Sequence, residues 1–362
     1  MRILYGVVGE GMGHATRSRV ILNHLSRVRG HQIEVVVSGR AHGYLRRAFP
    51  ELPIHEIAGM NIIYEDNVVK RRKTALAFLK KLPAYAENYD KMGLLHDRFN
   101  PELCIADFET FAYLFAKQYD LPVLSIDNMQ IINRAAIKED LEIPPQHQND
   151  FRLTKAIVKS KLPRCDHYLI TTFFFPSLRK KRTSLFPPIL RPEILEARAT
   201  ATMGEHVLVY QTSDTYGDLL PMLQSMPETR FVVYGYKRDQ DLGNVQLRDF
   251  SETGFVADLA SARAVIAGGG YSLMGEAVYL GKPMLALPLR HQFEQTLNSL
   301  YLGKLGYGEL CEDLSPERVR AFLANAPRYA DNLQAHRQDG NEQLLAALDT
   351  LVAEIHQRGR LV

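Results

Sequence analysis

Residues 268–277 read Gly-Gly-Gly-Tyr-Ser-Leu-Met-Gly-Glu-Ala, and the rest of the chain is best interpreted from this stretch. The apolar run at 264–267 predicts the end of a buried strand, and residues 273–280 predict a helix. Glycines at such a turn let the backbone approach a ligand closely, and the free N–H groups of a first helical turn suit a phosphate. Glu276, about one turn into the helix, is placed to accept hydrogen bonds from ribose hydroxyls. The alternative is a tight turn that binds nothing.

A second polar loop follows the next predicted strand. Residues 284–287 are apolar and end at Pro288, and residues 290–298 read Arg-His-Gln-Phe-Glu-Gln-Thr-Leu-Asn. Buried strands that lead into polar loops at their carboxyl ends form the ligand crevice of open α/β sheets. Because carboxylates and amides are good partners for sugar hydroxyls, Glu294 and Gln295 are candidate sugar-binding residues. The two loops together indicate a ligand in which a phosphate is attached to a sugar.

The spacing of these residues resembles the donor-binding signature of GT-B glycosyltransferases. The resemblance is strongest to the peptidoglycan N-acetylglucosaminyl transferase of glycosyltransferase family 28 and to the UDP-glycosyltransferases. It implies that Glu276 holds the ribose and that Glu294 and Gln295 hold the donor sugar. The positions that carry it are Gly270, Glu276, Ala277, Gly281, Pro283, Pro288, Glu294, Gln295 and Asn298. The donor-nucleotide residues that it implies are Ser213, Phe255, Gly269, Gly270, Ser272, Leu273 and Glu276.

The chain also departs from these families. They place a His or an Arg just before the glycine that corresponds to Gly270, where this chain has Gly268 and Gly269, so a charged contact to the diphosphate is missing. Glu294 stands where the UDP-glycosyltransferases have Asp. Phe255 either stacks on the nucleotide base or packs in the core. The resemblance covers most of the chain in arrangement, and most strongly residues 250–298.

The N-terminal segment predicts a strand at 3–8, a glycine-rich loop, a helix and a second strand at 33–37. The loop reads Gly-Glu-Gly-Met-Gly-His at residues 9–14, which is not the Gly-x-Gly-x-x-Gly spacing of a dinucleotide site. The second strand ends in Ser-Gly-Arg at 38–40, without the acidic residue that would hold an NAD ribose, so a dehydrogenase is disfavoured. We expect Gly11, Gly13 and Arg17 on the acceptor side of the site.

His14 is the candidate catalytic base. At a helix N-terminus the dipole disfavours the imidazolium, and a neutral imidazole can accept a proton from a hydroxyl. A capping or packing histidine is the alternative, but the UDP-glycosyltransferases carry a comparable Gly-His with the histidine as base. Asp107, after the apolar run 103–106, is the expected orienting carboxylate, although it would equally suit the N-cap of the helix 111–119. Asp127, after the run 123–126, competes for the orienting role.

The 362-residue chain is long enough for two domains. We predict an α/β protein of two Rossmann-like, doubly wound domains facing a cleft, the GT-B arrangement. Residues 1–186 form the acceptor-binding domain, whose last strand is expected at 166–172, and the proline-rich segment 187–192 is the linker. Residues 193–340 form the donor-binding domain. The helix at 341–362 returns to the first domain, as the resemblance implies.

Composition limits the partners and the compartment. A net charge of +3 does not demand nucleic acid, and three distant cysteines fit a reducing cytosol. The sequence lacks an uninterrupted apolar run long enough to span a membrane. Residues Val68 to Leu82 predict a basic amphipathic helix, either a contact to an anionic membrane through its lysines or a surface helix with its apolar side in the core. The lysines are Lys70, Lys73, Lys80 and Lys81.

The leading hypothesis is an inverting, metal-independent glycosyltransferase without a resident cofactor. It would move a hexosyl or N-acetylhexosaminyl group from a nucleotide-diphospho-sugar, expected to be a UDP-sugar, to an acceptor hydroxyl. The protein is expected in the cytoplasm or peripherally on the inner face of the membrane. The acceptor is left open, with a lipid or lipid-linked sugar of the cell envelope as one class. The alternatives are a nucleotide-sugar 2-epimerase or hydrolase of the same fold, and a nucleotide-sugar-binding protein without catalysis.

Overall fold

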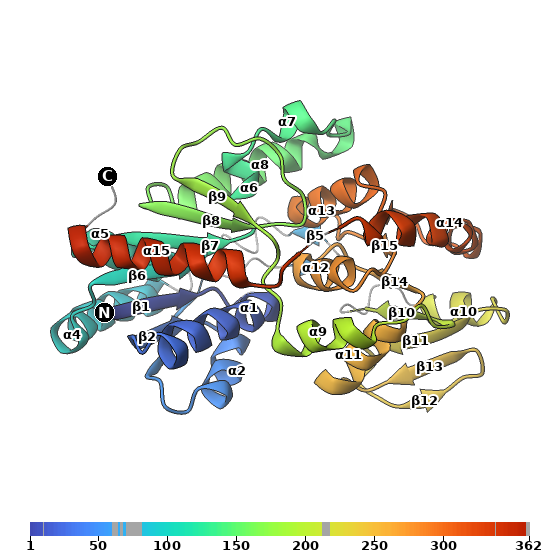
Figure 1. The fold of residues 1–362 in the computed structure, drawn as a ribbon, viewed down its shortest axis with the longest axis horizontal. Coiled ribbons are helices and arrows are strands. Elements are labelled where there is room, and N and C mark those ends of the chain that lie inside the picture. The colour runs from blue at the N-terminus through green and yellow to red at the C-terminus, as the bar shows by residue number, and fades with distance from the viewer. Residues whose placement is uncertain are drawn as a thin grey trace. The chain divides into compact units, whose positions relative to one another are not determined.

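The structure of the protein is a computed structural model that describes residues 1–9, 11–59, 64–65, 68–69, 82–211, 218–336 and 338–359. The fold is α/β, as predicted, with two seven-stranded sheets and helices packed on them (Figure 1). The chain divides into two compact units. The first consists of Met1–Tyr64, Val69–Ile189 and Asp339–Val362, and the second of Glu65–Val68 and Leu190–Gln338.

The sheet of the first unit is entirely parallel, in the order β3-β2-β1-β6-β7-β8-β9. Its strands are β1 (Arg2–Val7), β2 (Gln32–Val37), β3 (Ile54–Glu56), β6 (Leu103–Asp107), β7 (Val123–Asp127), β8 (His167–Thr171) and β9 (Thr183–Phe186). Apolar runs such as β6, buried along its whole length, are typical of strands covered on both faces. The expectation that residues 166–172 form the last strand was wrong, because β9 pairs with β8 at the edge of the sheet.

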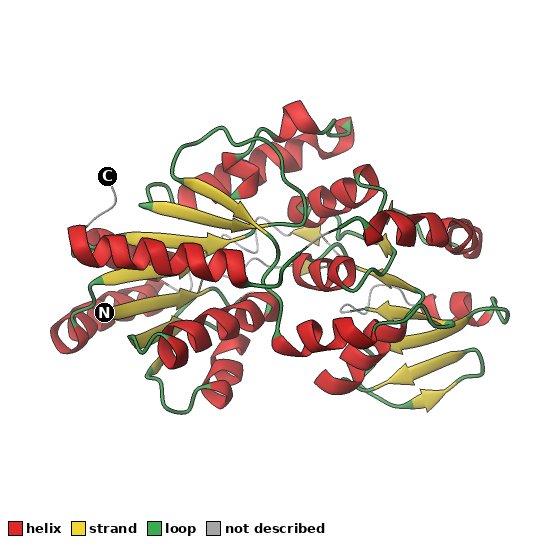
Figure 2. Cartoon of the chain, viewed as in Figure 1, coloured by secondary structure: helices red, strands yellow, loops and turns green. Residues whose placement is uncertain are grey.

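Helices connect these strands and cover the sheet (Figure 2). They are α1 (Met12–Asn23) with a π-helical continuation η1 (His24–Val28), α2 (Arg40–Ala48), α4 (Leu82–Phe99), α5 (Thr110–Gln118), α6 (Ile131–Arg134), α7 (Ile137–Asp140), η2 (Pro145–His147), α8 (Gln148–Lys161) and α15 (Glu342–Arg358). The predicted helix from Val68 was wrong at its start, because Val68–Val69 form strand β5, which pairs with β4 (Tyr64–Glu65). The lysines of that prediction, at 70, 73, 80 and 81, lie outside the described residues.

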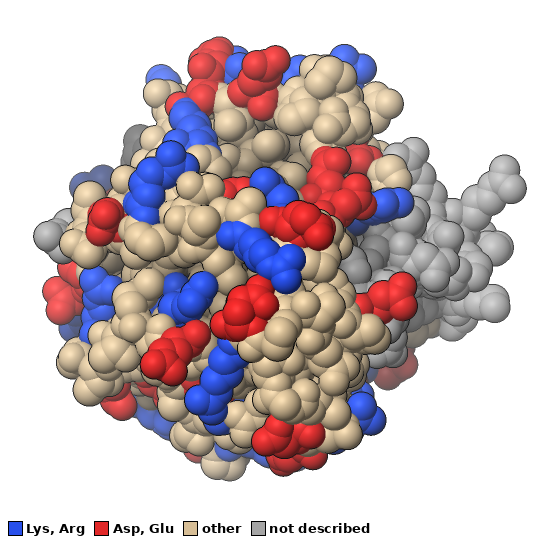
Figure 3. Space-filling model, turned by 90° about the vertical axis from the view of Figure 1, so that its right-hand side faces the viewer, with Lys and Arg blue, Asp and Glu red and all other residues tan. Residues whose placement is uncertain are grey.

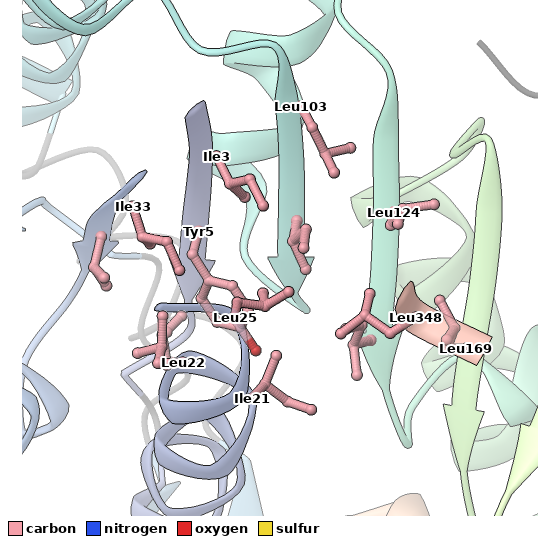
Figure 4. Close-up of a cluster of buried hydrophobic side chains, with 14 of the residues drawn as sticks. Ile3, Tyr5, Ile21, Leu22, Leu25, Ile33, Leu103, Leu124, Leu169 and Leu348 are labelled. Carbon is pink, nitrogen blue, oxygen red and sulfur yellow. The ribbon is translucent and has the colours of Figure 1, made fainter. Parts of the chain in front are cut away.

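The core of the first unit includes side chains from both ends of the sequence (Figure 4). Ile3 and Tyr5 of β1 pack with Leu22 of α1, and Leu348 of α15 belongs to the same cluster. Four α15 residues at helical spacing, namely Leu344, Leu348, Val352 and Ile355, are almost fully buried in it. Burying an aliphatic side chain of this size contributes roughly 1.5–3 kcal/mol, so α15 is an integral part of this unit.

The second unit repeats the architecture. Its sheet has the order β12-β13-β11-β10-β14-β15-β16, and only β12 runs antiparallel to its neighbour. The strands are β10 (His206–Tyr210), β11 (Arg230–Tyr234), β12 (Gln240–Asp241), β13 (Val245–Arg248), β14 (Ala264–Ala267), β15 (Met284–Ala286) and β16 (Gly308–Leu310). The helical segments are α9 (Pro192–Ala197), η3 (Arg198–Thr200), α10 (Leu219–Gln224), α11 (Glu252–Ser261), α12 (Tyr271–Tyr279), α13 (Phe293–Lys304) and α14 (Pro316–Gln334).

Local signals in the sequence set the helix starts in this unit. Ser251 caps α11 by accepting a hydrogen bond from the Gly254 N–H at 3.0 Å. Ser315 caps α14 in the same way, with Pro316 at the first helical position. The proline-rich segment predicted as a linker contains the division between the units, after Ile189, and α9 begins at Pro192.

The surface carries charges of both signs. Figure 3 shows Lys, Arg, Asp and Glu side chains interspersed on the face in view. Among the described helices, none is both long enough and apolar enough to span a bilayer.

Candidate active site

Each sheet has one point at which the strand order reverses, and Asp107 and the glycine-rich loop after β14 lie at these points. In the first unit the reversal lies between β1 and β6, where Val7 is paired with Asp107. In the second unit it lies between β10 and β14, which pair from Val207 to Tyr210. In open α/β sheets the carboxyl ends of the strands at such a point form the ligand crevice. The loop after β1 and the glycine-rich loop after β14 both occupy this position.

The first unit brings His14, Arg17 and Asp107 together. His14 is the third residue of α1, and its Nδ1 lies 2.7 Å from Oδ1 of Asp107 at the end of β6. Arg17, one turn further along α1, donates from Nε to Oδ2 of Asp107 at 2.9 Å and from Nη2 to Oδ1 at 2.5 Å. Ser18 donates its hydroxyl to Oδ2 at 2.9 Å. The carboxylate is therefore held at both oxygens.

The structure separates the alternatives for the orienting carboxylate. Asp107 does not cap the following helix, because Glu109 is the N-cap of α5 and accepts from the Ala112 N–H at 2.7 Å. Asp127 is engaged elsewhere, accepting from the Ser125 hydroxyl at 2.6 Å and from the Gln130 N–H at 2.7 Å. Asp107 is thus the carboxylate in contact with His14.

Burial and charge together set the protonation states of this network. Burial, and then the Arg17 charge, lower the pKa of His14 below its ordinary value. Burial opposes ionisation of Asp107, but Arg17 and His14 outweigh it and hold the pKa of that carboxyl at about 2. Near neutral pH the network therefore consists of the neutral His14 imidazole beside an ion pair of Asp107 and Arg17. The His14 side chain keeps 18% of its surface exposed, whereas that of Asp107 keeps 1%.

One expectation for this loop needs correction. Arg17 was predicted on an acceptor-side loop, but it lies inside α1, is 5% exposed, and is committed to Asp107. Its Nη1 also donates to Oδ1 of Asn128 at 2.7 Å, and Asn128 is a buried residue that the sequence analysis did not single out. The position of Asn128, directly after β7, was the available signal. Gly11 is the N-cap of α1, and Gly13 lies in its first turn.

In the second unit the two central glycines of the loop differ in their surroundings. A Cβ atom on Gly269 would lie 2.5 Å from the carbonyl oxygen of Gln295, so α13 can approach this closely only because residue 269 is glycine. The Asn298 amide donates to the Gly269 carbonyl at 3.1 Å and fixes the approach. A Cβ on Gly270 would meet nothing within 4 Å. Packing within the protein therefore requires glycine at 269 but not at 270.

The helix after this loop begins earlier than predicted. α12 starts at Tyr271 instead of residue 273, with Gly270 as an N-cap that has no side chain to satisfy the first-turn N–H groups. Ser272 and Leu273 thus lie within the first turn and are partly exposed. The N–H groups of a first helical turn have no partner within the helix, which favours an anion at such a position.

Glu276 is paired with a residue that the sequence analysis missed. Arg191, just before α9, donates from Nε to Oε1 of Glu276 at 2.8 Å and from Nη2 to Oε2 at 3.0 Å. Its Nη1 contacts Glu252 at 3.2 Å. Burial disfavours the charged guanidinium, but the two carboxylates outweigh this effect and raise the pKa of Arg191. Each oxygen of Glu276 can still accept a second hydrogen bond, so the pair does not exhaust its capacity for ribose hydroxyls.

The predicted sugar-binding pair lies in the first turn of α13, on the loop after β15. Oε1 of Gln295 accepts from the Leu289 N–H at 3.0 Å, which braces this loop. Glu294 and Gln295 are both partly exposed. The strand that leads into this loop, β15, is directly beside β14, so both residues follow the same sheet edge as the glycine-rich loop.

Phe255 occupies the core and not a stacking position. It lies within α11, is 3% exposed, and packs against Tyr210, Tyr234 and Phe250 with ring centroids 5.1–5.6 Å away. Phe250, in the loop before α11, is 56% exposed. Of the two aromatic rings, Phe250 is the one available to a planar ligand. Ser213 lies outside the described residues.

Neither metal clusters nor an Asp-rich site accompany these loops in the described part of the chain. No group of three or more His, Cys, Asp or Glu residues is placed to hold a metal ion in the described ranges. An Asp-x-Asp sequence occurs at Asp239 and Asp241, beside and within the edge strand β12. Asp239 accepts from the Asp249 N–H at 3.1 Å and Asp241 from the Gly243 N–H at 2.9 Å, so both stabilise the local turns.

Comparison with known proteins agrees with this architecture. Residues 1–327 match the family model described as glycosyl transferase family 1. A protein of Methanosarcina mazei named "Uncharacterized glycosyltransferase" is 24% identical over 346 residues, covering 88% of each chain, and one of Methanosarcina acetivorans is 23% identical over 349 residues. Both relatives are named as glycosyltransferases, and each is matched over 88% of its length.

Solved structures resemble the chain over nearly its whole length. The glycotransferase of kitacinnamycin has a TM-score of 0.67 and 17% identity, covering 96% of this chain and 98% of its own. Phytolacca americana UGT2, complexed with UDP-2fluoro-glucose and pterostilbene, has a TM-score of 0.66 and 11% identity, and Acinetobacter baumannii MurG has 0.61 and 15%. Both cover 96% of this chain and at least 97% of their own. The chain therefore belongs to glycosyl transferase family 1 and is a glycosyltransferase with the GT-B fold.

Proposed function

We propose that this glycosyltransferase moves a hexosyl or N-acetylhexosaminyl group from a UDP-sugar to an acceptor hydroxyl, with inversion and without a metal or resident cofactor. The first unit supplies the catalytic base, and the second holds the donor. The observation that carries the proposal is the buried network in which Asp107, fixed by Arg17, contacts Nδ1 of His14. A base held this way needs no second protein nucleophile, which favours a single displacement over a two-step reaction through a covalent intermediate.

His14 would act through its other ring nitrogen. In the tautomer that carries its hydrogen on Nδ1, the ring donates to Asp107, and the lone pair of Nε2 is available to accept the proton of the acceptor hydroxyl. The lowered pKa of His14 keeps the ring neutral near pH 7. The Asp107 carboxylate then stabilises the imidazolium that forms as the proton moves. Arg17 would keep Asp107 ionised and in place.

The glycine-rich loop and α12 would bind the UDP group. The Gly270 position has room for a ligand to approach the backbone, and the first-turn N–H groups of α12 would bind the phosphates and stabilise the leaving diphosphate. Glu276 would accept from the ribose hydroxyls while Arg191 orients it. Glu294 and Gln295 would hold the donor sugar, and the exposed ring of Phe250 would cover the base.

Because helix N–H groups can stabilise the leaving group, the proposed reaction assigns no step to a metal ion. We place it in the cytoplasm or at the inner face of the membrane, with a lipid or lipid-linked sugar as one class of acceptor. The predicted basic helix at Val68 to Leu82 remains a proposed membrane contact.

The experiment is to incubate the enzyme with a panel of nucleotide-sugars, with and without EDTA, and to measure nucleotide release with and without candidate acceptor alcohols and lipids. UDP release that requires an acceptor, persists in EDTA, and gives a product of inverted anomeric configuration supports the proposal. Acceptor-independent release would instead indicate a hydrolase. A rearranged nucleotide-sugar would indicate a 2-epimerase, and binding without release a protein that only binds the donor. If the enzyme prefers a nucleotide-sugar with another base, UDP is not the nucleotide of its donor.

A further inference from the structure

Lys161, the last residue of α8, is a half-buried lysine without a counter-ion in the described part of the chain. Among the residues that the structure describes, none forms a salt bridge with it. Its Nζ lies instead over the ring of Phe108, 4.3 Å from the ring centroid. A cation in the last turn of a helix is favourable for the helix dipole, which accounts for a lysine at the end of α8 but not for its position over Phe108.

Phe108 connects this cation with the catalytic network. One neighbour of Phe108 is Asp107, which lies 2.7 Å from Nδ1 of His14, and the other is Glu109, the N-cap of α5. Phe108 itself has a φ of 52°, in the left-handed region that bulky residues rarely adopt. Such strained residues are found preferentially at functional sites. The turn at Phe108 thus joins the carboxylate that contacts His14 to the ring that lies beneath Lys161.

The charged groups of this region differ in their accessibility. Four of them are buried within the first unit and at most 6% exposed, namely Arg17, Asp107, Glu109 and Asp127. The His14 side chain keeps 18% of its surface exposed, and Lys161 is half-buried. The charge of Lys161 also contributes, after burial and Arg17, to the lowered pKa of His14. A ligand that reaches His14 therefore comes under the influence of an accessible, unpaired cation.

We propose that Lys161 binds an acid group of the acceptor, so that the preferred acceptor carries a carboxylate or a phosphate in addition to the hydroxyl that His14 deprotonates. This assignment rests on the proposed function, because it concerns the acceptor of that reaction. It adds the charge of the acceptor, which the proposed function leaves open. The lysine ammonium is a compact cation with three donors, so it can pair with either kind of anion.

An acid group at Lys161 also makes His14 a stronger base. The charge of Lys161 disfavours the imidazolium, and an anion that pairs with Lys161 offsets that charge. The pKa of His14 should therefore rise towards its ordinary value when an acidic acceptor is bound. An uncharged acceptor leaves the Lys161 charge in place and the pKa of His14 lowered. Acidic acceptors are thus favoured both in binding and in proton transfer.

The first measurement is independent of transfer. The pKa of His14 is determined by NMR in the full chain, in potassium acetate, in potassium phosphate and in potassium chloride of equal ionic strength. Relative to chloride, acetate and phosphate should raise the pKa of His14 in the wild type but not in Lys161→Met. The matched control is Lys159→Met, which removes an exposed lysine from the same helical turn and should respond like the wild type.

The outcomes of this titration are distinct. A rise with only one of the two anions supports the site and identifies its acid group as a carboxylate or as a phosphate. A wild-type pKa that responds to neither anion overturns the proposal, and so does an equal rise in Lys161→Met.

The second measurement compares acceptors that differ only in charge. The probes are 4-(hydroxymethyl)benzoate with 4-(hydroxymethyl)benzamide, and glycerol 3-phosphate with glycerol. In at least one pair, kcat/KM should favour the acid about tenfold or more, the scale of one hydrogen bond to a charged group. Lys161→Arg and Lys159→Met should keep this preference, whereas Lys161→Met should lose it.

The two measurements together separate this proposal from the proposed function. If Lys161→Met retains the preference of the wild type for the acid, Lys161 does not bind the acceptor. If both pairs are used without any preference for the acid, the proposal is likewise overturned. Absence of transfer to every acceptor, combined with a Lys161-dependent response of the His14 pKa to anions, would count against the proposed function and leave the anion site intact.

Discussion

Arg191 donates to both carboxylate oxygens of Glu276, although the two residues are 85 positions apart in the sequence. Both side chains are at most 10% exposed, so the pair is bidentate and nearly shielded from water. This contact joins the segment before α9 to the helix that follows the glycine-rich loop. The acidic residue expected to bind ribose is therefore held in a defined orientation before any donor arrives.

The first prediction concerns the stability of this pair. Arg191→Ala should lower the free energy of unfolding by about 3–5 kcal/mol, because it leaves the buried Glu276 carboxylate without a cation. Adding Glu276→Gln should recover part of the loss, since the uncompensated charge is then removed. Urea denaturation of the wild type and the two variants measures both effects. If Arg191→Ala alone is as stable as the wild type, the ion pair does not stabilise the protein.

The second prediction compares two adjacent glycines. Gly269→Ala should destabilise the protein, because its Cβ would be forced against the Gln295 carbonyl, and a clash of this kind costs about 1–3 kcal/mol. Gly270→Ala meets no neighbouring atom and should leave the melting temperature unchanged while weakening UDP binding. Calorimetry with UDP and thermal denaturation distinguish the two. Unchanged UDP affinity in the folded Gly270→Ala variant would place the phosphates elsewhere.

The third prediction concerns the catalytic base. His14→Ala should lower transfer by about 10²–10⁴-fold, the usual contribution of a general base, and should leave UDP affinity unchanged. Because the pKa of His14 is lowered, the fraction of neutral imidazole falls only below pH 6.5, and the acid limb of kcat/KM should lie there. Asp107→Asn should give a smaller loss, since the ring remains but loses its orienting charge. Full transfer activity in His14→Ala would rule out this mechanism.

The fourth prediction concerns Lys282, a nearly fully buried lysine that donates to the Thr202 carbonyl. Burial, then Arg198, lower its pKa to about 8. The unfolded chain therefore binds more protons than the folded protein between pH 8 and the ordinary lysine pKa, so stability from this group rises with pH through that window. Relative to Lys282→Met, the wild type should gain stability between pH 8 and about pH 10 in urea denaturation. If the free energy of unfolding depends on pH in the same way in both proteins, the pKa of Lys282 is not lowered.

The strands and the loops at their carboxyl ends could be predicted from the sequence because each is marked locally. The run at 264–267 forms β14 over those same residues, since four buried apolar positions followed by three glycines have few alternatives. The contact between His14 and Asp107 was expected from the resemblance to the UDP-glycosyltransferases, with Asp127 as the competitor, and the structure places Asp107 against His14. Strand β9 was missed because its sequence, Thr183–Phe186, follows a basic run and has only one buried residue.

Long-range partners could not be predicted. Arg191 and Asn128 carry no local signal for the residues that they contact, because only the folded chain brings them to Glu276 and Arg17. Phe255 shows the reverse problem. Its position before the glycine-rich loop suggested a ligand contact, but its helix turns it inward against Tyr234, and the exposed ring belongs to Phe250. The direction of a side chain depends on helix phase, and an error of one or two residues reverses it.

The packing of α15 has a consequence for how the protein is made. The first unit is discontinuous in the sequence, and its core includes Leu344, Leu348, Val352 and Ile355, which the ribosome adds after the whole of the second unit. During synthesis the first unit therefore leaves its ribosome with an apolar groove open, although most of its sheet is already complete. The second unit can close its own core earlier. The first unit is thus begun first and completed last. Nascent chains that are stalled before residue 342 should therefore bind chaperones through this unit.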